Sequence, residues 1–112
     1  ISATTSQKIT AMLTESTQRW FAKAGGVPGY QLAGKTGTSQ IASSQWGYEK
    51  GENGRTNTSY AGYGPSSDPK FVIIVRFDRP RSTQYAEFSS AKTFKEISTF
   101  LLKYYGVPPY QP

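Results

Sequence analysis

The sequence of 112 residues contains no cysteine and no histidine. Without cysteine, the chain offers no disulfide, no thiolate nucleophile and no cysteine-ligated metal centre. Without histidine, it has no imidazole base and lacks the commonest protein ligand of transition metals. Hydroxyls, amines, carboxylates and backbone groups must carry any chemistry, and we expect neither a metal nor a cofactor.

Long apolar segments are missing as well. No run of roughly 18 apolar residues, the minimum for a membrane-spanning helix, occurs anywhere. The first four residues do not show the charged and then apolar pattern of a signal peptide. We therefore expect any membrane anchor to lie outside this chain.

Acidic residues are few, with 7 Asp and Glu against 13 Lys and Arg and a net charge of +6. This balance favours anionic surroundings such as nucleic acid, anionic lipid or an acidic cell-wall polymer. The basic residues are scattered along the chain, however, and no nucleic-acid motif is present. We interpret them, including the local group Arg76, Arg79 and Arg81, as a solvated surface, and expect no nucleic-acid partner.

Apolar spacing predicts a helix at each end of the chain, over residues 1–24 and 89–105. Ser2 or Thr4 can cap the first helix, and two glycines end it. Residues 106–112 are too rich in proline to continue the second helix and are expected to form a tail. The predicted buried positions recur every three or four residues: Ile9, Met12, Leu13, Trp20 and Phe21 in the first helix, and Phe94, Ile97, Leu101 and Tyr104 in the second.

Residues 30–79, between the helices, have the pattern of a three-stranded antiparallel sheet with a polar loop over residues 43–58. A turn bounded by Pro65 and Pro69 predicts that the last two strands form a hairpin. The continuous apolar run 71–75 predicts a strand buried on both faces. The fold class is therefore α+β, a single segment in which an antiparallel sheet of three strands is flanked by an N-terminal and a C-terminal helix.

One stretch of the sheet carries candidate chemistry: Gly34-Lys35-Thr36-Gly37-Thr38-Ser39. The Lys35 ammonium supplies positive charge, the Thr36 and Thr38 hydroxyls donate hydrogen bonds, and Gly37 lets a ligand approach the backbone. This combination suits a substrate carboxylate. The Lys-Thr-Gly triplet alone also fits an ordinary strand whose lysine faces solvent.

The sequence around the triplet resembles the C-terminal part of the transpeptidase domain of class B (monofunctional) penicillin-binding proteins. The extended form Gly-Lys-Thr-Gly-Thr-Ser-Gln at residues 34–40 carries most of this likeness, which residues 60–65, 68–70 and 106–109 support. The match covers nearly the whole chain and weakens over residues 85–93. The resemblance implies that the chain is part of a penicillin-binding-protein/β-lactamase-like transpeptidase fold.

The family implies a peptidoglycan D,D-transpeptidase at the extracytoplasmic face of the cytoplasmic membrane, in the bacterial cell envelope. A serine attacks the D-Ala-D-Ala end of a peptidoglycan stem peptide, and the acyl group then passes to a neighbouring amine and crosslinks the cell wall. β-Lactam antibiotics mimic this substrate. A β-lactamase or D,D-carboxypeptidase of the same superfamily is an alternative, and a non-catalytic basic binding module is another.

The family's machinery needs Ser-x-x-Lys for the nucleophile and Ser-x-Asn for proton relay, in addition to Lys-Thr-Gly. Ser67 and Lys70 fit the first pattern, but Pro69 is incompatible with the helical turn that the nucleophile requires. Ser89 begins a predicted helix, yet Lys92 falls on its polar face. Ser-x-Asn does not occur. We therefore expect both motifs in the remainder of the transpeptidase domain, a partner polypeptide, and expect this chain alone to be inactive.

Residue by residue, the resemblance implies that Lys35 makes the site positive and helps to hold the substrate carboxylate. Thr36 and Thr38 would hydrogen-bond that carboxylate, and the Thr38 N–H would be one donor of the oxyanion hole. Gly37 would leave room for the helix that bears the nucleophile. Lys35 and Thr36 point to opposite faces of a flat strand, so both contribute only if the strand is a twisted edge strand.

Two lesser expectations concern the surroundings of this strand. Trp46 and Tyr48 could line a substrate groove, although loop aromatics more often pin a loop to the surface. The family also implies that two strands from elsewhere in the domain lie beside the strand of residues 71–78. Because that strand otherwise has a bare edge, we expect the isolated chain to be unstable and prone to aggregate.

Overall fold

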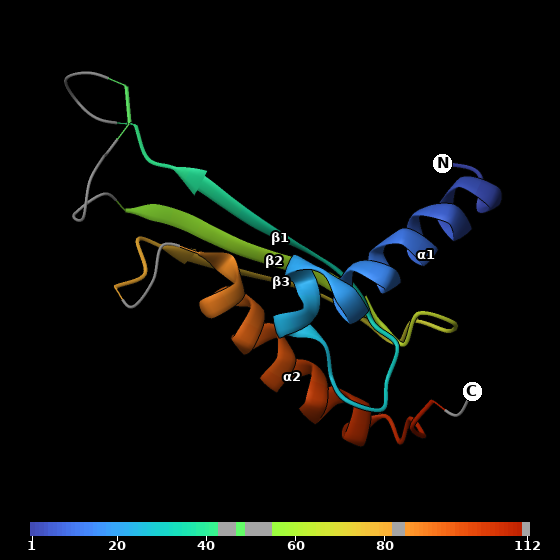
Figure 1. The fold of residues 1–112 in the computed structure, drawn as a ribbon. Helices are drawn as coiled ribbons and strands as arrows, with labels where there is room; N and C mark the ends of the chain where they lie inside the picture. The colour runs from blue at the N-terminus through green and yellow to red at the C-terminus, as the bar shows by residue number, and fades with distance from the viewer. Residues whose placement is uncertain (43–46, 49–54, 82–84, 111–112) are drawn as a thin grey trace.

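The computed structural model describes residues 1–42, 47–48, 55–81 and 85–110 (Figure 1). Its elements are α1 (Ala3–Arg19), η1 (Phe21–Gly25), β1 (Ala33–Gln40), β2 (Thr56–Gly64), β3 (Phe71–Asp78), η2 (Ala86–Phe88) and α2 (Ser90–Tyr104), where η denotes a 3-10 helix. The strands form one antiparallel sheet in the order β1-β2-β3, which confirms the predicted fold class. α2 runs along one face of the sheet, and α1 lies at the end where β1 begins.

Several element boundaries differ from the predicted ones. The first α-helix ends at Arg19 rather than at residue 24, and η1 follows it. β2 begins at Thr56, so the end of the predicted loop 43–58 is strand, while residues 43–46 and 49–54 lie outside the described residues. The hairpin between β2 and β3 is present, with Gly64 opposite Phe71 and a cis peptide bond between Gly64 and Pro65.

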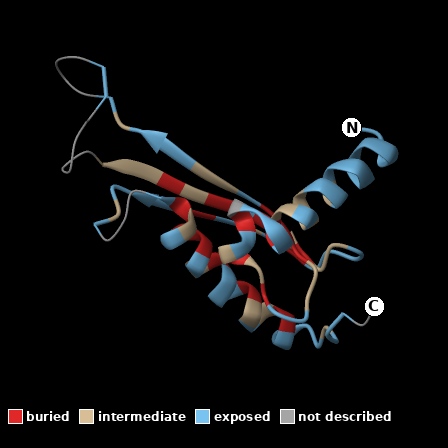
Figure 2. Ribbon diagram, viewed as in Figure 1, coloured by how far each residue is buried: buried red, intermediate tan, exposed pale blue. Residues whose placement is uncertain are grey.

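α1 is attached to the sheet through threonine hydroxyls rather than through the predicted apolar stripe. Ser2 caps its first turn, which is one of the two caps predicted. The Thr10 hydroxyl is hydrogen-bonded to the Tyr63 hydroxyl, and the Thr17 hydroxyl donates to the Leu32 carbonyl. Most of the helix is exposed (Figure 2), because no other described element covers its apolar side. Three residues that were predicted to lie in the core are therefore exposed: Ile9, Met12 and Trp20.

α2 buries a stripe that agrees only in part with the predicted one. Phe94 is buried as expected and Leu101 is half-buried against the core, but Ile97 and Tyr104 are 38% and 71% exposed. Small side chains let α2 approach the sheet closely, and because they carry little hydrophobic signal, the apolar spacing identified only part of the buried face. The buried residues of α2 are Ser90, Ala91, Phe94, Ser98 and Leu102. None of the described helices is both long enough and apolar enough to cross a membrane.

The prediction that residues 71–75 are buried on both faces is wrong for the part of the chain that the structure describes. β3 is an edge strand, and β2 is its only strand neighbour there. Phe71 and Val75 are buried in the core, whereas Val72 and Ile74 point to the other face and are 75% and 73% exposed. No described element covers these two side chains.

The predicted tail folds back onto the molecule as far as residue 110. The Tyr110 N–H donates to the Gly29 carbonyl at 2.6 Å. The Tyr30 hydroxyl donates to the Val107 carbonyl at 3.2 Å. These contacts hold the end of α2 against the segment that leads into β1.

Tyr60 occupies the centre of the core between the sheet and the helices. Its side chain is fully buried, and its ring centroid lies 4.5 Å from that of Phe94. The Tyr60 hydroxyl donates to the Ala22 carbonyl at 2.9 Å. Burial raises the pKa of the Tyr60 phenol well above its usual range, so the group stays protonated and keeps its donor. Tyr60 therefore joins β2 to both η1 and α2.

Two glycines make this packing possible, because a side chain at either would occupy the space of a ring. A Cβ atom at Gly34 would collide with the ring and hydroxyl of Tyr60. A Cβ atom at Gly62 would lie 2.5 Å from Phe94 Cζ and 2.7 Å from the Ala33 carbonyl oxygen. Such approaches are closer than van der Waals contact allows, so neither position can hold a larger residue without rearrangement.

We predict that Gly62→Ala lowers the free energy of unfolding by about 1–3 kcal/mol, the usual cost of overpacking a core. The added methyl group would meet both an aromatic ring and a backbone carbonyl that cannot swing aside. Urea-induced unfolding of the folded protein measures the effect. Ala61→Ser, at the neighbouring exposed position, should change stability by less than about 0.5 kcal/mol. Equal stability of Gly62→Ala and the unmodified protein would contradict this account of the core.

Candidate active site

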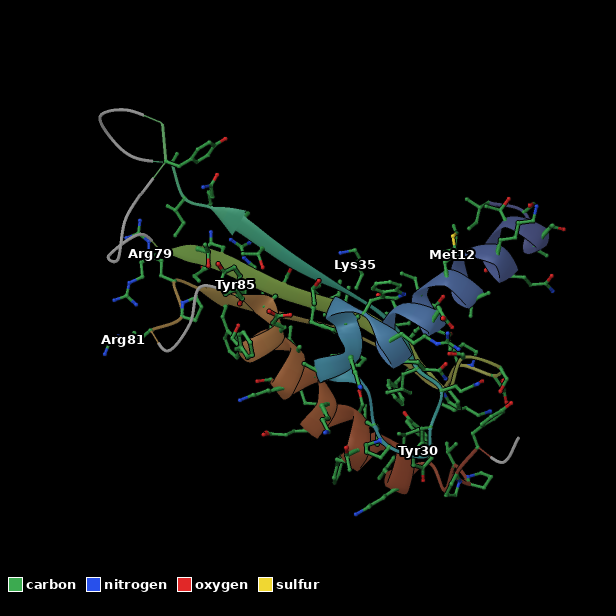
Figure 3. The ribbon with its side chains drawn as sticks, in the orientation of Figure 1. Met12, Tyr30, Lys35, Arg79, Arg81 and Tyr85 are labelled. Carbon is green, nitrogen blue, oxygen red and sulfur yellow. The ribbon has the colours of Figure 1, made fainter. Side chains whose placement is uncertain are left out.

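β1 carries the strip Lys35–Thr38 along an open edge of the sheet. β1 pairs with β2 alone, so its outer edge has no strand partner among the described residues. Lys35 and Thr38 are exposed, while Thr36 and Gly37 are half-buried. Lys35 projects from β1 on the side away from α2 (Figure 3). β1 is thus an edge strand, as the roles expected of Lys35 and Thr36 require.

Two hydrogen bonds orient side chains of the strip. Lys35 Nζ donates to the Thr36 carbonyl at 2.9 Å, which holds the ammonium group against the strand. The Thr38 hydroxyl accepts a hydrogen bond from the Ala86 N–H at 3.2 Å. Since that bond uses a lone pair of the oxygen, the hydroxyl hydrogen of Thr38 is left to donate to a ligand.

A cleft of about 300 Å³, the β1–η2 cleft, opens beside the strip. β1 forms one wall, and η2 with the residue before it forms the other. The second wall was not predicted, because it lies in the stretch where the family pattern weakens. The aromatic residue Tyr85, which is 57% exposed, was the available signal. The lining residues are Lys35, Thr36, Thr38, Tyr85, Ala86 and Glu87.

Gly37 is crowded from the neighbouring strand. It lies opposite Ser59 of β2, and a Cβ atom at Gly37 would be 2.5 Å from Ser59 Oγ. A side chain here would displace that hydroxyl, so the glycine of the triplet has a local packing role. Its expected second role, leaving room for the helix that bears the nucleophile, stays a prediction.

The two serines with a lysine three residues later do not form a nucleophile–base pair. Ser67 is exposed in the β2–β3 turn, and Lys70 forms an ion pair at 2.8 Å with an aspartate of the same turn. The Ser89 hydroxyl is hydrogen-bonded to the Thr58 hydroxyl at 2.9 Å, and Lys92 is exposed on α2. No hydrogen bond joins either serine to a lysine in the described part of the chain.

The remaining candidates do not line the β1–η2 cleft in the part of the chain that the structure describes. Trp46 falls outside the described residues, and Tyr48 is 52% exposed. Arg76 forms an exposed ion pair with Asp78 at 2.9 Å, as a solvated strand end would. Within the described ranges, no group of three or more His, Cys, Asp or Glu side chains could hold a metal ion.

We predict that Thr38→Val weakens the junction between β1 and η2. Valine cannot accept the hydrogen bond of Ala86, and Ala86 is only 1% exposed, so its N–H would be buried without a partner at a cost of about 1–3 kcal/mol. Hydrogen exchange of the Ala86 amide should accelerate. Thr38→Ser keeps the hydroxyl and should retain protection. Unchanged exchange in Thr38→Val would show that the bond does not hold η2.

Comparison with known proteins establishes the family. Residues 1–99 match the penicillin-binding protein transpeptidase domain. A probable peptidoglycan D,D-transpeptidase of Pseudomonas aeruginosa, PbpC, is 36% identical over 84 residues, which are 74% of this chain and 14% of that protein. The chain belongs to the penicillin-binding protein transpeptidase family, as its resemblance predicted.

Solved structures agree in fold. The apo transpeptidase domain of penicillin-binding protein 3 from Burkholderia pseudomallei matches the whole chain with a TM-score of 0.84 and 27% identity. Penicillin-binding protein 3 from Mycobacterium tuberculosis, complexed with ampicillin, matches it with a TM-score of 0.82 and 29% identity. The chain covers 33% and 26% of those two chains, and thus spans only part of the proteins that it resembles.

Proposed function

We propose that this chain forms the substrate-binding part of a peptidoglycan D,D-transpeptidase whose nucleophilic serine lies on another part of the domain. The observation that carries the proposal is the open outer edge of β1, where the strip Lys35–Thr38 can be approached from the side. A peptide or β-lactam that lies along this edge would meet backbone groups and side chains of the strip together. The ampicillin complex of the Mycobacterium tuberculosis relative supports a β-lactam ligand.

In this proposal, Lys35 attracts the terminal carboxylate of the stem peptide, and the Thr36 and Thr38 hydroxyls donate hydrogen bonds to it. The Lys35 ammonium donates a hydrogen bond to the Thr36 carbonyl. This contact supports a Thr36 carbonyl that points to the open edge of β1 and not toward β2. Backbone groups of a strand repeat their direction every second residue, so those of Thr38 would face the same edge. The Thr38 N–H is then placed to stabilise an oxyanion.

The chemistry follows from that placement. The serine oxygen, supplied by the rest of the domain, attacks the carbonyl carbon of the penultimate D-Ala and gives up its proton to a base there. Negative charge builds on the carbonyl oxygen, where the Thr38 N–H would donate. The peptide C–N bond then breaks and releases D-Ala as the leaving amine takes a proton. An amine of a neighbouring stem peptide attacks the resulting ester and restores the serine.

The setting implied is the bacterial cell envelope. There the remainder of the transpeptidase domain, with Ser-x-x-Lys and Ser-x-Asn, would be the partner of this chain, and any membrane anchor would belong to that remainder. The exposed side chains Val72 and Ile74 of β3 support such a partner, because apolar groups on a sheet face are stabilised when another layer covers them.

We predict that fluorescent penicillin does not label this chain alone and, once the two parts are combined, labels the polypeptide that carries Ser-x-x-Lys. Denaturing electrophoresis, which separates the two polypeptides, identifies the labelled one. Label on this chain itself, at Ser67 or Ser89, would refute the proposal that the nucleophilic serine lies on the other polypeptide. With stem peptides, crosslinked product would support a transpeptidase, whereas hydrolysed product alone would indicate a carboxypeptidase.

We predict that Lys35→Ala slows penicillin acylation of the assembled domain by about 10²-fold, because it removes the positive charge that holds the ligand carboxylate. Stopped-flow or gel-based acylation rates measure this change. An exposed strand lysine contributes little to folding, so thermal stability should stay nearly constant. Lys92→Ala, which removes an exposed lysine of α2, is the matched control and should acylate normally. Equal rates for Lys35→Ala and the unmodified domain would exclude Lys35 from the site.

A further inference from the structure

The β1–η2 cleft is lined by residues of both charges. Lys35 lines it from β1, and Glu87 lines it from η2. These two groups do not form an ion pair with each other in the described part of the structure, although both line one space of about 300 Å³. A volume near the low end of the usual range for ligand pockets allows one bound molecule to touch both walls.

Glu87 differs from the other described carboxylates. Glu15, Asp68 and Asp78 each form an ion pair, and Glu96 is exposed on the surface of α2. Glu87 is half-buried, and no hydrogen bond or ion pair involves its carboxylate among the described residues. A partly desolvated carboxylate without a counter-ion is stabilised when a cation binds to it.

We propose that Glu87 is a specificity residue that binds an ammonium group on the acyl-donor peptide. The inference rests on the proposed function, which places the terminal carboxylate of that peptide against Lys35 and the two threonines. Because Glu87 lines the same cleft as those residues, one bound molecule can reach both, and we assign the ammonium to the donor itself. The preferred donor is therefore a peptide that ends in D-Ala-D-Ala and bears a free side-chain amine close to that end.

The cleft also disfavours a neutral substitute for that amine. Tyr85, an exposed aromatic residue, lines the same cleft as Glu87, and a ring face attracts a cation more strongly than a neutral amide. An acetylated amine would leave the Glu87 carboxylate partly desolvated and still unpaired. Discrimination therefore rests on charge, and a dimethylated amine, which keeps its charge, should be accepted.

The test uses the domain assembled from this chain and the polypeptide that carries the serine. Single-turnover acylation rates are measured, without an acceptor amine, for donor peptides whose side-chain amine is free, dimethylated or acetylated. The two charged donors should acylate about two- to fivefold faster than the acetylated one, as expected for a partly exposed ion pair. Glu87→Gln should abolish this preference, and Glu87→Lys should reverse it.

Controls separate this inference from the proposed function. Glu96→Gln makes the same charge change outside the cleft and should retain the full preference. Benzylpenicillin has no ammonium group that could bind Glu87. Its acylation rate should therefore change less than about twofold in Glu87→Gln, a change smaller than the loss of one weak interaction would cause. If penicillin acylates the assembled domain but the charged donors show no advantage, or if the advantage survives in Glu87→Gln, the assignment of Glu87 is overturned.

Two further outcomes would also contradict the role proposed for Glu87. If Glu87→Gln slows only the transfer to an added acceptor amine, the ammonium belongs to the acceptor and the donor assignment is wrong. If penicillin fails to acylate the assembled domain at all, the proposed function fails, and the role of Glu87 fails with it.

Discussion

The contact between the Tyr60 ring and Gly34 is the constraint on which the site depends. The ring fits against β1 only because Gly34 has no side chain, and its hydroxyl is tied to the Ala22 carbonyl of η1. Phe94 of α2 closes the other side of the ring. The strip Lys35–Thr38 begins directly after Gly34, so the same contact that fills the core also determines where the strip lies relative to α2.

Sequence reasoning succeeded where the pattern was local. The hairpin, the Ser2 cap and the helix at each end followed from spacing and from turn residues, and the fold class from their order. The triplet and its flanking residues indicated the family, which the comparisons confirm. The edge position of β1 in the described sheet also agrees with the expectation for that strand.

It failed where burial depends on which neighbours are present. The run that contains Val72 and Ile74 has the composition of a strand buried on both faces, yet no element of the described ranges covers these two side chains. On α2, the small residues Ala91 and Ser98 are buried, whereas the larger apolar side chains of Ile97 and Phe100 are exposed. The cleft wall at Tyr85–Glu87 could not be found from spacing, because its partners on β1 are almost 50 positions away in the chain and a long-range hydrogen bond brings them together.

The hydrogen bond from the Ala86 N–H to the Thr38 hydroxyl connects the binding strand to the start of α2. Thr38 and Ala86 line the same cleft, and Ala86 is followed within a few residues by the helix that packs on Tyr60. A displacement of α2 along the sheet would therefore also move the Thr38 hydroxyl. Substitutions in the helix can in this way change the position of the strip without contacting it.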